Sequence, residues 1–102
     1  MSTIKIIFHS IHFDADAKLE AFIEERVQKL VKMSDQVIEA EIFLKLENDS
    51  NLENKVVEIK LVIPGNDLFA KKNSRTFEEA TDSTIEALRR QLKKRKEKIW
   101  GN

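Results

Sequence analysis

Positively charged side chains gather near one end of this chain. The stretch RRQLKKRKEK, Arg89 to Lys98, contains seven Lys or Arg residues and one Glu, although the chain of 102 residues has a formal net charge of zero. From Met1 to Glu86 the chain has 11 basic and 17 acidic residues. Ammonium and guanidinium groups neutralise phosphates and release their counterions, and compensating a helix dipole needs far fewer cations. The charge pattern therefore indicates a polyanionic partner.

Residues that could catalyse a reaction are sparse. The chain has no Cys, its serines lie in no nucleophile-elbow motif, and its two glycines, Gly65 and Gly101, form no phosphate-cradling loop. His9 and His12 stand three positions apart, but no other His or Cys completes a set of metal ligands. We therefore expect no enzymatic activity, no catalytic residue, no metal site, no cofactor and no small-molecule substrate.

Neither the composition nor the N-terminus predicts a membrane or secreted protein. No apolar run is long enough to cross a bilayer, and MSTIKIIFHSIHF lacks the pattern of a signal peptide. The absence of cysteine fits a reducing compartment, so we expect a cytoplasmic protein. The basic end could instead lie on a membrane surface with Trp100 as an anchor. Against this, Leu88 and Leu92 continue an apolar stripe that begins at Phe77, which favours packing against a sheet.

Two helices and four strands are expected to position the charged residues. Residues 14–33 read as a helix with Asp16 as its N-cap. The last helix begins at a capping box formed by Thr76 and Glu79 and extends to about Trp100. Alternating apolar residues predict strands over 3–11, 37–47 and 55–63, and a turn at 64–67 leads to a short strand over 67–74. In the second strand, one buried face is expected to consist of Ile38, Ala40, Ile42, Leu44 and Leu46.

The order β-α-β-β-β-α predicts an α+β, two-layer sandwich. We expect a four-stranded, mostly antiparallel sheet whose one face is covered by both helices and whose other face meets solvent. Residues 1–102 are expected to form one domain, with the basic helix end at about 87–100.

Several segments, in the same order along the chain, resemble the ribosome hibernation-promoting factor family. This family is also called the ribosome-associated inhibitor, ribosomal subunit interface or sigma-54 modulation protein family. The similar segments are LEAFIEERVQKL (19–30), IKLVIPGNDLFAK (59–71) and TFEEATDSTIEALRRQLKKRKEK (76–98). The chain departs from the family pattern where the first strand ends, because it keeps a histidine there but lacks the usual arginine.

The resemblance implies a double-stranded RNA-binding-domain-like fold and a non-enzymatic function. It implies a hibernation factor that binds the small ribosomal subunit (16S rRNA) and the whole ribosome. Bound in the channel for messenger RNA and tRNA, such a factor inhibits translation in stationary phase or stress. The chain resembles short members, without a C-terminal dimerisation domain. A general double-stranded RNA-binding module or RNA chaperone is the alternative, and a protein-interaction module with an acidic sheet face (Glu39, Glu41, Glu47 and Glu58) is a third possibility.

The resemblance also ranks the basic residues as RNA contacts. The final helix pattern implies first Arg90, Lys94 and Lys96, and then their neighbours Arg89, Lys93 and Arg95. The remaining candidates are Arg26 and Lys29 on the first helix, Lys71, Lys72 and Arg75 around the fourth strand, and His12.

Some of these candidates have an alternative structural explanation. Helix salt bridges could account for Arg26 and Lys29, although we expect Glu25 to be out of reach of Arg26. A charged edge strand could account for Lys71, Lys72 and Arg75.

Overall fold

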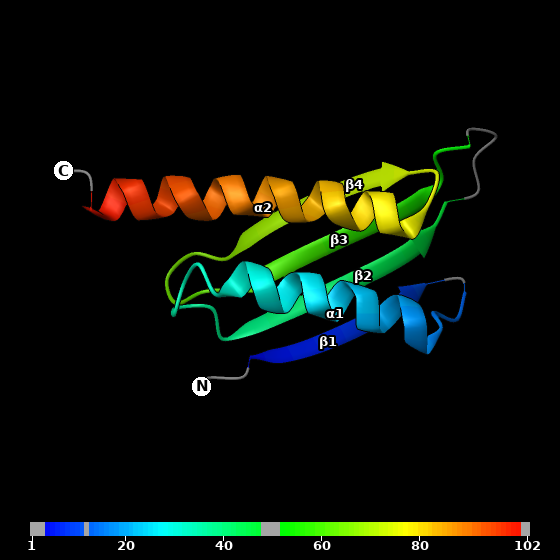
Figure 1. Ribbon diagram of the computed structural model, residues 1–102, viewed down its shortest axis with the longest axis horizontal. Coiled ribbons are helices and arrows are strands. Elements are labelled where there is room, and N and C mark those ends of the chain that lie inside the picture. Colours follow the sequence, from blue (N-terminus) through cyan, green and yellow to red (C-terminus); the bar gives the residue numbers. More distant parts are fainter. Residues whose placement is uncertain (1–3, 12, 48–51, 101–102) are drawn as a thin grey trace.

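The computed structural model describes residues 4–11, 13–47 and 52–100, and their side chains as far as residue 96. Six elements follow one another in the expected order β-α-β-β-β-α (Figure 1). They are β1 (Lys5–Ile11), α1 (Ala17–Val31), β2 (Glu39–Leu46), β3 (Lys55–Val62), β4 (Leu68–Ser74) and α2 (Phe77–Trp100).

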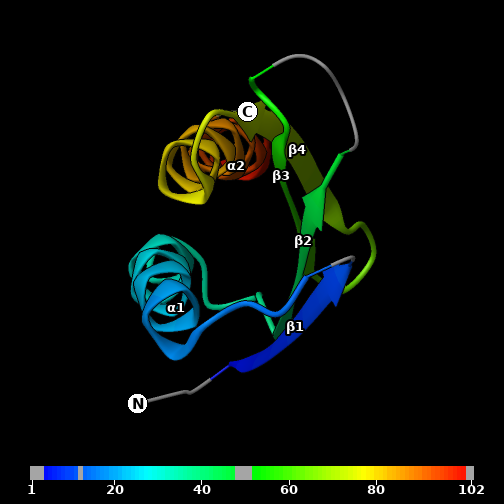
Figure 2. The same ribbon diagram turned by 90° about the vertical axis from the view of Figure 1, so that its right-hand side faces the viewer.

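The four strands form one mixed sheet in the order β1-β2-β3-β4. β1 runs parallel to β2, while β2, β3 and β4 pair antiparallel with their neighbours. A parallel pair requires a crossover connection, and α1 supplies it. Both helices lie on the same side of the sheet (Figure 2). The prediction of an α+β two-layer sandwich with a mostly antiparallel sheet is confirmed.

The core lies between the sheet and the two helices. Every second residue of the central strands points into it, as the alternating pattern predicted. The helices contribute residues spaced three and four apart, which form one apolar stripe on each helix. The fully buried members include Ala40, Ile42 and Leu44 of β2, Val57, Ile59 and Leu61 of β3, Ile23 and Val27 of α1, and Ala80 and Leu88 of α2.

The expected start of the second strand is wrong by two residues. Ile38 was expected on the buried face, but 57% of its surface is exposed, whereas Val37 is buried. β2 begins only at Glu39, and the alternation starts there. Ile38 already pairs with the sheet, because its N–H donates to the carbonyl of Val62 at 3.0 Å. Its side chain nevertheless lies outside the core because the loop after α1 turns Val37 inward instead.

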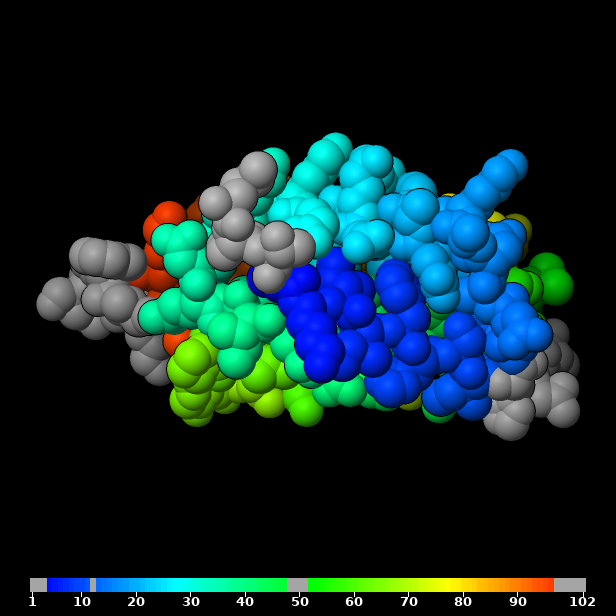
Figure 3. Space-filling view, turned by 90° about the horizontal axis from the view of Figure 1, so that it is seen from below, coloured from blue at the N-terminus to red at the C-terminus, as the bar shows by residue number. Residues whose placement is uncertain are grey.

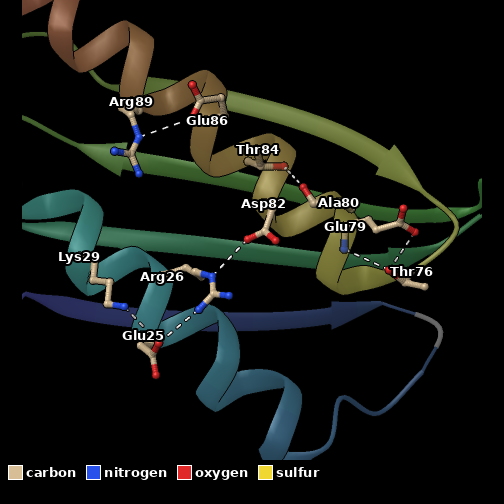
Figure 4. A network of polar contacts seen from close by, with 10 residues as sticks. All are labelled: Glu25, Arg26, Lys29, Thr76, Glu79, Ala80, Asp82, Thr84, Glu86 and Arg89. Carbon is tan, nitrogen blue, oxygen red and sulfur yellow. Dashed lines mark hydrogen bonds and ion pairs between the residues drawn. The ribbon is translucent and has the colours of Figure 1, made fainter.

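Both predicted helix starts are confirmed, and one differs in detail. The N–H of Leu19 donates to the carboxylate of Asp16 at 2.8 Å, which caps α1. At the start of α2, the N–H of Glu79 donates to the hydroxyl of Thr76 at 3.0 Å. That hydroxyl donates in turn to the Glu79 carboxylate at 3.2 Å, where a complete capping box would use the backbone N–H of Thr76 (Figure 4).

Two buried threonines on α2 differ in how their hydroxyls are satisfied. The hydroxyl of Thr84 donates to the carbonyl of Ala80 at 2.7 Å. It also lies 3.3 Å from the carbonyl oxygen of Val57. The hydroxyl of Thr81 is buried and has no hydrogen-bond partner among the described residues. A buried polar group without a partner costs free energy, whereas a paired one stabilises the fold modestly.

We therefore expect opposite effects from one substitution at neighbouring positions. Thr81→Val should raise the free energy of unfolding by about 1 kcal/mol, because it removes an unpaired hydroxyl at nearly constant volume. Thr84→Val should lower it by about 1 kcal/mol, because it removes a hydroxyl that is hydrogen-bonded. Urea denaturation of the two variants measures both, and equal effects would contradict the assigned hydrogen bonds.

Candidate nucleic-acid interface

The charge of α2 changes sign along its length. Glu78, Glu79, Asp82 and Glu86 occupy the first half, and the Lys and Arg residues follow from Arg89 onward. This order complements the helix dipole, whose N-terminal end is positive and whose C-terminal end is negative. We refer to Arg89–Lys96 as the basic segment of α2.

Packing of the apolar stripe determines which way the basic segment faces. Leu88 and Leu92 are buried, so the residues on the other sides of the helix meet solvent. At about 100° per residue, the exposed cations form two neighbouring rows along the helix. One row consists of Arg89, Lys93 and Lys96, and the other of Arg90 and Lys94; all five are exposed.

Among the described side chains, few acidic ones compete for these cations. Glu86 lies 3.5 Å from Arg89 and 3.8 Å from Arg90, so one exposed carboxylate serves two guanidinium groups. Exposed pairs of this kind contribute about 0–1 kcal/mol. Lys93, Lys94 and Lys96 have no ion-pair partner among the described residues. A phosphate can therefore replace the existing contacts of the basic segment at little cost.

Arg95 differs from its neighbours because it is partly buried. It donates from Nη2 to the side-chain oxygen of Gln36 at 2.8 Å, which links α2 to the loop after α1. Its Nε atom is buried and has no hydrogen-bond partner within the described part of the chain. Arg95 was predicted as an RNA contact together with Arg89 and Lys93, but the fold holds it against the loop instead of on an exposed row.

The two candidates on α1 are engaged in ion pairs (Figure 4). Arg26 lies 3.2 Å from Asp82 of α2 and 3.2 Å from Glu25, and its guanidinium lies 4.2 Å from the ring centre of Phe22. The expectation that Glu25 is out of reach of Arg26 is wrong, because both side chains are long enough to meet beside the helix. Lys29 lies 3.5 Å from Glu25 and remains exposed. Salt bridges, the alternative explanation, thus exist for both residues, and their RNA contacts stay a prediction.

The three basic residues around β4 point in different directions. Lys71 lies on the sheet face away from the helices, 3.6 Å from Glu58. Lys72 lines a shallow groove together with Arg90, Asp82 and Glu86, and so adjoins the basic segment. Arg75 is exposed in the bend between β4 and α2. His12 lies outside the described residues.

Sequence reasoning missed one exposed cation beside the basic segment. Lys32 caps the C-terminal end of α1 and lines a hollow together with Lys96 of α2. Its position in the sequence could have identified it, because a lysine at the C-terminal end of a predicted helix interacts favourably with the helix dipole. What the sequence could not reveal is that the end of α1 faces the far end of α2.

The uncovered face of the sheet is a mosaic of opposite charges and not an acidic surface. Lys60 lies 3.7 Å from Glu41, and Lys71 is paired with Glu58 as described above. His9 stacks on Phe43 with ring centres 4.7 Å apart and lies 3.3 Å from Glu41. The face is thus not uniformly acidic, because β3 places Lys60 opposite Glu41 and β4 places Lys71 opposite Glu58.

Two other features bear on the kind of site. In the described ranges, no three His, Asp or Glu side chains come together as metal ligands. The same residues contain no helix that is both long enough and apolar enough to span a bilayer. The candidate site is the positively charged surface around the basic segment of α2, because exposed ammonium and guanidinium groups can bind phosphates.

Two solved structures share this fold over nearly their whole length. A ribosomal subunit interface protein from Coxiella burnetii superposes with a TM-score of 0.77, at 21% identity, over 91% of this chain and 98% of that one. The N-terminal domain of Protein Y from Thermus thermophilus superposes with a TM-score of 0.74, at 17% identity, over the same shares of the two chains.

The family itself follows from the sequence match. Residues 6–100 match the family described as "Sigma 54 modulation protein / S30EA ribosomal protein", and the chain belongs to this family. A ribosome hibernation promoting factor from Pseudomonas putida is 30% identical over 87 residues, which cover 85% of this chain and 81% of that protein. A ribosome hibernation promotion factor from Deinococcus radiodurans is 29% identical over 77 residues, or 74% of this chain. That match spans only 40% of the Deinococcus protein.

The contacts of Arg26 predict that it contributes to stability more than an exposed cation does. Arg26→Ala removes an ion pair between the helices and a guanidinium–ring contact, and should lower the free energy of unfolding by about 1 kcal/mol. Lys93→Ala, at an exposed position without a partner among the described residues, should change it by less than about 0.5 kcal/mol. Thermal and urea denaturation of both variants provide the comparison, and equal losses would show that Arg26 does not join the helices.

Proposed function

We propose that this protein is a non-enzymatic ribosome hibernation factor that inhibits translation. It binds the small ribosomal subunit, through 16S rRNA, and the whole ribosome. During stationary phase or stress, it occupies the channel for messenger RNA and tRNA and so prevents both from binding. Its place of action is the cytoplasm, and residues 1–102 act as one ribosome-binding domain.

One observation carries this proposal: the basic segment of α2 is exposed on two rows within a chain that belongs to this family. RNA is recognised largely by shape and by contacts to the phosphate backbone. A helix with cations on two adjacent sides can contact phosphates on both walls of a narrow channel. The names of the relatives, ribosome hibernation promoting factors, support the same partner.

The proposed contacts follow from the described surroundings of each residue. Arg90, Lys94 and Lys96 are exposed and avoid the apolar stripe, and among the described residues they make one weak ion pair, between Arg90 and Glu86. Arg89 and Lys93 share a row with Lys96, and Lys72 extends the surface beside Arg90. We assign direct RNA contacts to these six first. We assign weaker RNA contacts to Arg26, Lys29, Lys71 and Arg75. The first three already form ion pairs within the protein, and Arg75 lies outside the basic segment.

Removal of three charges from the basic segment should not unfold the protein, but should weaken ribosome binding so far that the complex does not survive a sucrose gradient. We expect the variant Arg90→Ala, Lys94→Ala, Lys96→Ala to stay at the top of a sucrose gradient while the unmodified protein travels with the small subunit and the whole ribosome. The matched control removes three exposed or half-exposed lysines elsewhere, at Lys5, Lys18 and Lys45. Equal binding by the two variants would mean that the basic segment is not the contact surface.

Salt should weaken the complex in proportion to the number of phosphates contacted. With about six contacts, affinity should fall roughly a thousandfold between about 50 and 200 mM salt. Because each lost phosphate contact reduces the slope of log affinity against log salt by about one, the triple variant should reduce it by about three. Fluorescence anisotropy with labelled protein and isolated small subunits measures both slopes, and an unchanged slope would contradict the assignment.

Competition separates ribosome binding from general RNA binding. If the channel is the site, bound messenger RNA and tRNA should block the protein and free duplex RNA should not. Efficient competition by duplex RNA would instead favour a general double-stranded RNA-binding module. Sedimentation of the protein with ribosomes in the presence of each competitor distinguishes the two functions.

A further inference from the structure

A hollow lies where the loop after α1 meets the second half of α2. In Figure 1 this loop lies at the end of α1 nearest to the C-terminal half of α2, and Figure 3 shows the loop beside the red end of that helix. The hollow has a volume of about 480 Å³. That volume falls within the roughly 300–1,000 Å³ typical of small-ligand sites. Its lining includes Lys32, Met33, Ser34, Gln36, Arg95 and Lys96.

Hydrogen bonds hold the walls of the hollow in place. The N–H groups of Met33 and Ser34 donate to the last carbonyls of α1, each at 3.1 Å. The hydroxyl of Ser34 accepts the N–H of Gln36 at 3.2 Å, and Gln36 in turn accepts from Arg95 at 2.8 Å. The site therefore exists before any ligand binds, which reduces the entropy lost on binding.

Arg95 combines a hydrogen-bonded guanidinium group with a buried donor that lacks a partner among the described residues. Gln36 fixes its planar guanidinium group, while its buried Nε has no hydrogen-bond partner among the described residues. Buried donors nearly always have a partner, so an exception calls for an explanation, and a functional role is one of them. A guanidinium plane held in this way is a surface on which nucleic-acid bases stack.

The remaining walls combine apolar and cationic groups. Leu92 is buried at the base of the hollow, and the half-buried Met33 packs against the core beside it. The thioether of a methionine makes favourable contacts with aromatic rings. Lys32 and Lys96 are exposed at the rim, and Asp35 is the one opposing charge among the described lining residues. An apolar and guanidinium interior with a cationic rim matches a base and its phosphates.

We propose that this hollow binds a single unstacked nucleotide of RNA. The base enters between Met33 and the Arg95 guanidinium, and its phosphates meet Lys32 and Lys96. The inference rests on the proposed RNA-binding function and adds a distinct requirement. The exposed rows of α2 need only a phosphate backbone, whereas this hollow requires a base free of its helix, as occurs in loops and bulges of RNA.

Chemical-shift mapping tests the site directly. ¹⁵N-labelled protein is titrated with a short single-stranded RNA of mixed sequence and, separately, with a duplex of the same length. The single strand should shift the backbone amides of residues 32–36 and 95, and the duplex should shift only those of the exposed rows. Absence of loop shifts with the single strand, or equal loop shifts with both RNAs, would overturn the proposal.

A matched pair of variants gives a second test. Ser34→Leu places an apolar side chain in the hollow without changing charge, and should weaken binding of the single strand at least about fivefold. Ser10→Leu makes the same change at an exposed position near the C-terminal end of β1, outside the lining of the hollow, and should have no effect. Equal affinities of the two variants would count against the hollow.

The outcome is separable from that of the proposed function. If Ser34→Leu binds ribosomes and single-stranded RNA like the unmodified protein, the hollow is not a nucleotide site and the exposed rows alone bind RNA. If the protein does not bind ribosomes but the loop amides still shift with single-stranded RNA, the nucleotide site stands and the ribosome as partner is wrong.

Discussion

The burial of one side of α2 against the sheet determines which way the charged side chains of this helix face. Leu88 and Leu92 are buried beside residues of β3 and β4, so the helix cannot rotate without exposing them. Each buried leucine contributes about 1.5–3 kcal/mol relative to an exposed one. Because helix positions are related by a fixed angle, this packing simultaneously exposes Arg90, Lys93 and Lys94. The apolar stripe therefore specifies the cationic surface, although none of its members carries charge.

One-sided burial of the helices and the sheet also explains why most of the fold could be predicted from the sequence. Periods of two and of three to four residues identified every element, because the sheet is covered on one face only and each helix has one buried side. The prediction failed at Ile38, where a loop residue, Val37, takes the buried position. Local spacing carries no information about such a change, since it depends on how the chain returns from α1 to the sheet.

The candidate site was predictable in part. The two exposed rows of α2 follow from helix geometry and from the position of the apolar stripe, and the sequence shows that stripe. The partners of Arg26 and Arg95 were not expected, because Asp82 and Gln36 lie 56 and 59 positions away along the chain. Lys71 and Lys72 are consecutive residues of a strand, so alternation alone places them on opposite faces of the sheet. They were nevertheless grouped together in the prediction, which did not apply this rule. Contacts that depend on tertiary packing require the fold, whereas alternation within one strand does not.

The reversal of charge along α2 gives the molecule an electric polarity that its zero net charge conceals. Four carboxylates lie in the first half of α2 and the cations in the second, within a body whose longest dimension is 47 Å. In the field of a large polyanion, such a molecule experiences a torque before it makes any contact. The C-terminal end of α2 turns toward the polyanion and the acidic end turns away, so that diffusion delivers the protein already oriented. A uniformly basic protein of the same affinity would lack this alignment and would adhere in many orientations.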